Sequence, residues 1–137
     1  MSISHIKKEK EIWPLLIEKG MAKAYGGYNM LKGGSIDTAF IDLTGGASIR
    51  IDFTDSSSQQ DIALYNFDPE ESMFGKLKRF LDEGYLLGAA TDGTEEIITE
   101  CKIVKGHAYA ILDIISYDGY HLLQLKNPWG KIVSAFN

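Results

Sequence analysis

Two apolar segments joined by a short turn place the strongest constraint on the fold of this chain. The segments are "IVKGHAYAILDII" at 103–115 and "YHLLQLKNPW" at 120–129, and "SYDG" lies between them. Strand-like segments on either side of a short Asp-Gly turn predict an antiparallel β-hairpin. The side chains of such a hairpin alternate between its two faces, so the length of the turn decides which residues share a face.

Two polar residues in this hairpin are candidates for chemistry. His107 stands between Gly106 and Ala108, and such small neighbours would let another backbone approach closely, as a substrate cleft requires. Asn127 could orient the histidine by accepting its ring N–H, and Trp129 could shield that contact from water. The structural alternatives are a core histidine, a turn-forming asparagine before proline, and a core aromatic residue.

The parity of the turn tests whether these two side chains meet. A two-residue turn in unbroken register would place Ala110 opposite Asn127 and point His107 to the other face. A three-residue loop over 117–119 would place Tyr109 opposite Asn127, with His107 as its same-face diagonal neighbour about 7 Å away. The sequence therefore predicts an odd-length loop if the two residues act together.

The rest of the chain predicts helices followed by mostly antiparallel strands, which is an α+β fold. The expected helices start near Trp13, at the N-cap Ser35 and at the N-cap Asp68 with Pro69 in the first turn, and end at the glycines 26, 45 and 84. Strands are expected at 47–53 and 85–91. A length of 137 residues fits a single domain spanning 1–137.

The composition excludes several classes of protein. A net charge of −5 gives no electrostatic support for a nucleic-acid partner, and no apolar run reaches the roughly 20 residues of a membrane span. The one cysteine, Cys101, forms no internal disulfide, which favours a reducing, cytoplasmic location. Cys101 is not expected to be a nucleophile for His107, because six residues of extended chain span about 20 Å. The three histidines share no metal-ligand spacing.

Four stretches together resemble a known family. "VKGHAYAI" and "LKNPWG" are similar to the histidine and asparagine motifs of the calpain protease core. "GYLLGAAT" and the segment 11–46 resemble the calpain sequence that precedes those motifs. The resemblance covers about residues 8–130, and it corresponds to the second half of the core.

The resemblance implies the second subdomain of a papain-like cysteine peptidase, with N-terminal helices packed on a mostly antiparallel sheet. His107 would be the general base and then the general acid, and Asn127 would orient it. Trp129 would cover their contact, while Gly106 and Ala108 would line the substrate cleft. The partner would be a protein or peptide substrate, and the location would be intracellular.

Departures from the family pattern shape the expected function. The Gly-x-Cys-Trp motif that carries the family nucleophile is absent, and Val133 replaces an acid that supports a calcium site. We therefore expect no cofactor in this chain and a core truncated at its C-terminus. The expected unit is inactive alone and needs a cysteine-bearing half from the same gene or another chain.

Two further expectations accompany this one. The alternative function is a non-catalytic calpain-fold module that binds protein partners or regulates a complete protease. An incomplete sheet would also leave a strand edge through which two copies could form a homodimer.

Overall fold

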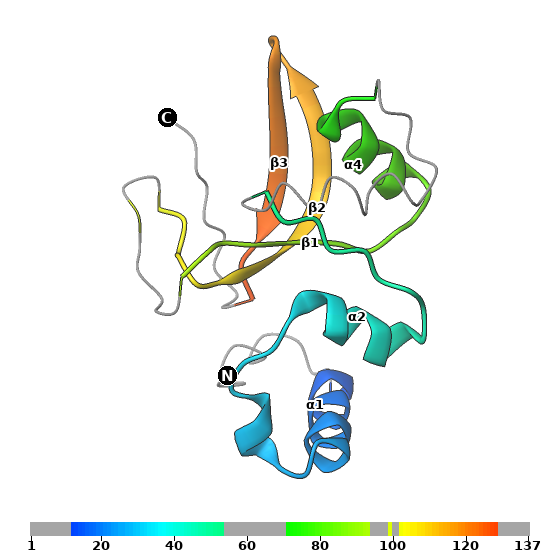
Figure 1. Ribbon diagram of the computed structural model, residues 1–137, viewed down its shortest axis with the longest axis vertical. Helices are drawn as coiled ribbons and strands as arrows, with labels where there is room; N and C mark the ends of the chain where they lie inside the picture. The colour runs from blue at the N-terminus through cyan, green and yellow to red at the C-terminus, as the bar shows by residue number, and fades with distance from the viewer. Residues whose placement is uncertain (1–11, 54–70, 94–98, 100–101, 129–137) are drawn as a thin grey trace.

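The computed structural model describes residues 12–53, 71–93, 99 and 102–128. The helical elements are α1 (Trp13–Ala24), the 3₁₀ helix η2 (Tyr28–Leu31), α2 (Ile36–Thr44) and α4 (Met73–Asp82). The strands are β1 (Leu87–Ala90), β2 (Ala108–Tyr117) and β3 (Tyr120–Lys126), and they form one antiparallel sheet in the order β1-β2-β3. Figure 1 shows α4 beside β2, with α2 between the sheet and α1. The predicted α+β class is confirmed.

The ends of α1 and α2 follow the local sequence signals. Helix α1 carries proline in its first turn and stops before Gly26, whose φ is +90°. Helix α2 follows the extended residue Ser35, whose hydroxyl donates to the Asp37 carboxylate, and ends at Gly45 with φ +69°. The predicted boundaries of both helices are confirmed. They are predictable because the signals that set each boundary lie within one turn of that helix end.

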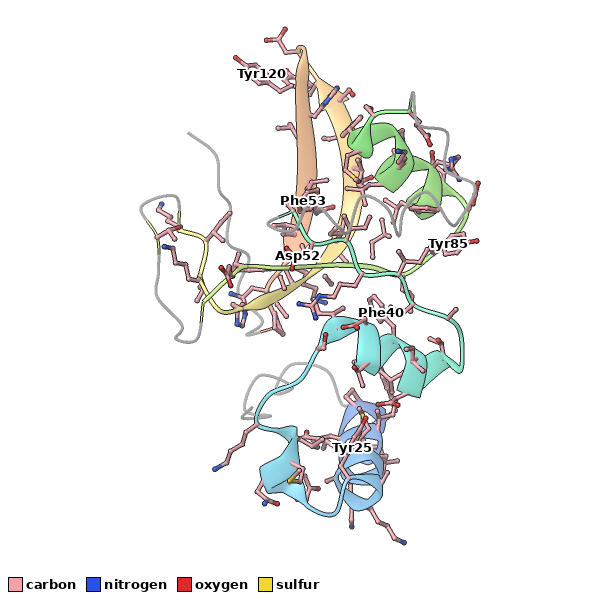
Figure 2. All side chains as sticks on the ribbon, viewed as in Figure 1. Tyr25, Phe40, Asp52, Phe53, Tyr85 and Tyr120 are labelled. Carbon is pink, nitrogen blue, oxygen red and sulfur yellow. The ribbon has the colours of Figure 1, made fainter. Side chains whose placement is uncertain are left out.

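A hydroxyl group joins the two N-terminal helices. The Tyr25 hydroxyl, just after α1, donates to the Asp42 carboxylate on α2. The hydrogen bond to Asp42 raises the pKa of Tyr25, and burial and the Asp42 charge act in the same direction. Tyr25 is marked beside α1 in Figure 2. Within the described residues, no helix combines the length and the apolar character needed to cross a bilayer.

Helix α4 begins later than the sequence predicts. Its N-cap is Ser72, which has extended backbone angles and accepts a hydrogen bond from Gly75 N at 3.1 Å. The predicted start at Asp68 and Pro69 is therefore wrong for this helix, and both residues lie outside the described part of the chain. The predicted end is confirmed, since Gly84 has φ +86° directly after the last turn.

Residues 47–53 do not form the predicted strand. They have no regular secondary structure and are not paired with β1, β2 or β3. Ile49 is 39% exposed and Phe53 is 79% exposed, so the alternating apolar residues do not define a buried face. The prediction fails because alternation specifies a strand only where a neighbouring strand is available for pairing.

The β2–β3 hairpin has a two-residue turn, so the predicted odd-length loop is wrong. Asp118 and Gly119 both have positive φ, +48° and +79°, and Tyr117 pairs with Tyr120. These angles fit the type of turn that matches the twist of a hairpin. Figure 2 shows Tyr120 at the tip of this hairpin.

The change of parity comes from a β-bulge within β2. Asp113 pairs with Gln124 but Ile111 pairs with Leu125, so Leu112 is an extra residue in β2. From the bulge onward the register is shifted by one residue, and Ala110 pairs with Lys126. Continuing this register places Tyr109 opposite Asn127, which is the pairing that the three-residue loop was expected to produce.

The bulge also keeps the buried side chains of β2 on one face. Tyr109, Ile111 and Ile114 are buried, although Ile111 and Ile114 are three residues apart. An extra residue between them restores the alternation that a regular strand would break. Helix α4 packs against β2 and β1, and its Phe74 ring stacks on His121 of β3 with centroids 3.9 Å apart.

The close contact between α2 and β1 requires a glycine. A Cβ atom on Gly88 would lie 2.7 Å from Cγ2 of Ile36, the first residue of α2. The methyl group Cγ2 is close to the main chain of Ile36, so the side chain has little freedom to move away. Gly88 therefore sets the distance at which α2 meets the sheet.

Substituting Gly88→Ala is expected to lower the free energy of unfolding by about 1–3 kcal/mol, because the new methyl group overpacks this contact. The matched control is Gly20→Ala in α1, where nothing lies within 4 Å of the added Cβ. That substitution should raise stability by up to about 1 kcal/mol through helix propensity. Urea unfolding of both variants checks the prediction, and equal effects would contradict it.

Candidate active site

His107 lies directly before β2 and is attached to the end of β1. Its register partner is Thr91, and Thr91 N donates to His107 O at 3.0 Å. His107 N donates to the Thr91 hydroxyl at 3.1 Å, and the same oxygen lies 2.7 Å from Val104 O. One threonine side chain therefore connects β1 to two positions of the turn that precedes β2.

This turn depends on a glycine with positive φ. Gly106 has φ +62°, and its N–H donates to Asp92 O at 3.2 Å. A Cβ atom on Gly93 would lie 3.2 Å from Gly106 N, so the two glycine backbones approach closely. Gly106 thus permits the approach of the chain's own backbone, and its predicted part in a substrate cleft stays a prediction. Ala108 is half-buried and pairs with Ala90.

The imidazole of His107 meets the side chain of Asn127. Nε2 of His107 and Oδ1 of Asn127 are 2.9 Å apart, and the residues are 8% and 1% exposed. An amide oxygen only accepts hydrogen bonds, so this contact requires a proton on Nε2. Nδ1 is then the nitrogen that exchanges a proton with another group. The expected His107–Asn127 contact is thus present, although the bulge rather than the loop creates it.

Tyr109, two residues after His107 and within β2, supports the ring. The rings of Tyr109 and His107 are perpendicular, with an interplanar angle of 84° and centroids 5.0 Å apart. The Tyr109 hydroxyl accepts a hydrogen bond from Val104 N at 2.8 Å. Because Tyr109 is buried and its ring and hydroxyl are both engaged, it limits the rotation of the imidazole and closes the 104–109 turn.

Some residues named in the sequence analysis are outside the described part of the chain, and one described histidine lies elsewhere. Trp129, Cys101 and Val133 lie outside the described residues. His121 stacks on Phe74 against α4 and is not part of the His107 cluster. Among the residues that the structure describes, no group of three or more His, Cys, Asp or Glu side chains could hold a metal ion.

Thr91 and Tyr109 are the site residues that the sequence did not single out. Tyr109 could have been found, because it is two residues after His107 on a strand and therefore shares its face. Thr91 has no such signal, since it is 16 residues away from His107 and only the β1–β2 pairing brings them together.

Comparison with known proteins decides the family. The family model described as calpain family cysteine protease matches residues 1–135. The chain belongs to the calpain family of cysteine proteases. It is 39% identical over 128 residues to the calpain-type cysteine protease DEK1 of Zea mays, which covers 93% of this chain and 6% of the relative. Calpain-8 of Rattus norvegicus is 34% identical over 136 residues and calpain-5 of Mus musculus is 32% identical over 143 residues, each covering 93% of this chain.

The calpain relatives are much longer than the matched segment. The chain spans 6% of the maize protein, 18% of rat calpain-8 and 22% of mouse calpain-5. The matched segment includes both His107 and Asn127, since the family model extends to residue 135.

Proposed function

We propose that this chain supplies the general base of a calpain-type cysteine endopeptidase and that the nucleophilic cysteine comes from another segment or chain. The observation that carries the proposal is the buried contact between His107 Nε2 and Asn127 Oδ1 at 2.9 Å. The chain belongs to a family of thiol proteases. In such enzymes a histidine acts as the base, and a fixed acceptor orients its ring.

The proton transfers follow from the tautomer. Nε2–H stays donated to Asn127, while Nδ1 accepts the proton of the cysteine thiol as the thiolate attacks the peptide carbonyl carbon. Nδ1–H then protonates the leaving amine when the C–N bond breaks, and a thioester remains. In the second half, Nδ1 takes a proton from water as the hydroxide attacks the thioester, and returns it to the departing thiolate.

The sequence is the reason for placing the nucleophile in another segment or another chain. The only cysteine is Cys101, and the motif Gly-x-Cys-Trp does not occur in the 137 residues. By itself the chain is therefore expected to be inactive on protein or peptide substrates. A thiol nucleophile also suits the reducing cytoplasm. The proposal has three further parts. Trp129 covers the imidazole ring, and Gly106 and Ala108 line the substrate cleft. Two copies of the chain form a homodimer through a strand edge.

A chimeric protease tests the proposal. This chain replaces the matched segment of the Zea mays relative, so that the relative supplies the cysteine-bearing half. The chimera is expected to hydrolyse a fluorogenic peptide and to be labelled by a peptidyl epoxide at the relative's cysteine, whereas the chain alone should do neither.

Two results would contradict the proposal. A chimera that unfolds cooperatively but neither cleaves nor labels would favour the non-catalytic calpain-fold module that binds or regulates a protease. Labelling of Cys101 in the chain alone, lost in His107→Ala, would show that the chain carries its own nucleophile.

A further inference from the structure

The hydroxyl of Thr91 occupies a position that a backbone carbonyl would take in a regular sheet. Thr91 and His107 are the register positions that follow the pair Ala90–Ala108. Thr91 N donates to His107 O at 3.0 Å, so an ordinary ladder would return His107 N to the Thr91 carbonyl. Instead, His107 N donates to Thr91 Oγ1 at 3.1 Å.

This substitution of a side chain for the backbone has a structural consequence. The same hydroxyl lies 2.7 Å from Val104 O and 3.2 Å from His107 O, so its proton is directed at the carbonyls of the turn. The chain can therefore leave the sheet into the positive-φ turn at Gly106 while the backbone of His107 stays anchored to β1.

The anchor acts on the imidazole through the backbone. The ring is held at Nε2 by Asn127 and at its edge by Tyr109, and neither contact fixes the Cα from which the ring extends. A displacement of that Cα would lengthen the 2.9 Å contact or direct Nδ1 away from the reacting thiol. Geometry of this kind must be held within about 0.5 Å for catalysis.

We propose that Thr91 is a positioning residue, whose hydroxyl holds the backbone of His107 where the ring can use Asn127 and present Nδ1. This inference rests on the proposed function of His107 as the general base. Thr91 touches neither substrate nor nucleophile, so its loss should lower kcat and leave KM nearly unchanged. A loss of about 10- to 100-fold is typical of residues that support a catalytic ligand from behind.

Three variants of the full chain test the proposal. Thr91→Val removes the hydroxyl and keeps the shape, and Thr91→Ser keeps the hydroxyl. The matched control is Thr44→Val in α2, because the Thr44 hydroxyl also donates to a carbonyl, Phe40 O at 2.6 Å, and accepts from a backbone N–H, Gly46 at 3.1 Å.

The readout is the long-range ¹H–¹⁵N NMR spectrum of the imidazole rings at a pH where they are neutral. We expect His107 in the native chain to be the Nε2-protonated tautomer, and Thr91→Val to produce mixed tautomers or exchange broadening at this ring alone. Thr91→Ser and Thr44→Val should keep the native signals. In the chimera, Thr91→Val should lower kcat and Thr91→Ser should restore it.

Several outcomes overturn the inference. A folded Thr91→Val chain with native His107 signals would do so, as would equal ring changes in Thr44→Val. If Thr91→Val does not fold, Thr91→Ala replaces it, and unfolding of both would make Thr91 a residue of general stability instead. The spectra do not depend on catalysis, so a ring that responds to Thr91 in an inactive chimera would reject the proposed function alone.

Discussion

Replacing His107 by alanine is expected to lower kcat/KM of the chimeric protease by about 10⁶-fold, which is the scale of loss when the base of a catalytic triad is removed. The thiol would lose the group that accepts its proton, and the leaving amine would lose its acid. Because the imidazole is 8% exposed and contacts Asn127, the variant should also unfold at lower urea concentration. Progress curves with a fluorogenic peptide, read beside urea unfolding, separate the two effects.

The companion substitution is Asn127→Ala, which removes the acceptor and keeps the base. The expected loss of kcat/KM is smaller, about 10²- to 10⁴-fold. Without the acceptor the imidazole rotates, but it still transfers protons while it is in the correct orientation. Asn127→Asp retains an acceptor at the same position and should recover part of the activity. Equal activity of Asn127→Ala and the parent chimera would show that the 2.9 Å contact is structural only.

Much of the fold was predictable where the deciding interactions are local. Gly26, Gly45 and Gly84 all have positive φ directly after the helices that they end, and a glycine in that position is visible in the sequence. The start of α4 was misplaced because Asp68-Pro69 and Ser72 are both suitable N-terminal signals. The structure has the N-cap at Ser72, and the sequence does not rank the two signals.

Non-local pairing was predicted less well. The alternation of Ile49, Ile51 and Phe53 resembles a strand, but its formation depends on a partner elsewhere in the chain. For the hairpin, the change of parity was predicted in the loop, whereas the structure has it at a bulge within β2. The sequence of β2 does contain a sign of the bulge. Buried residues follow each other at Tyr109 and Ile111, but the next buried residue is Ile114 and not residue 113.

The His107–Asn127 contact was predictable because the two residues flank one hairpin and their chemistry is complementary. The contribution of Thr91 was not predictable, because a threonine at a strand end has many uses and its partners are backbone atoms of the turn before β2. The candidate side chains of the site are therefore easier to predict from the sequence than the residues that hold their backbone.

Deleting Gln124 from β3 is expected to disrupt the site. Gln124 is exposed, so its side chain contributes little, but its removal shifts the register of every residue after it. Leu125 and Asn127 would leave the buried face and Lys126 would enter it. The expected cost is about 3–5 kcal/mol of unfolding free energy, the range for buried charges and lost core contacts, together with loss of the His107–Asn127 contact.

Deleting Leu112 from β2 is the matched control, and the register predicts the opposite result. Leu112 is the bulged residue, so its removal leaves Ile111 opposite Leu125 and Asp113 opposite Gln124 as consecutive pairs of a regular ladder. The buried residues Ile111 and Ile114 would then alternate normally, and His107 would still meet Asn127. Deleting Leu112 should therefore lower the free energy of unfolding by about 1 kcal/mol or less, and deleting Gln124 should lower it several times more. Urea unfolding measures the stability of each variant, and the imidazole NMR spectrum reports the His107–Asn127 contact. If the Gln124 deletion kept the native His107 signals and the Leu112 deletion lost them, the bulge would not be the source of the register.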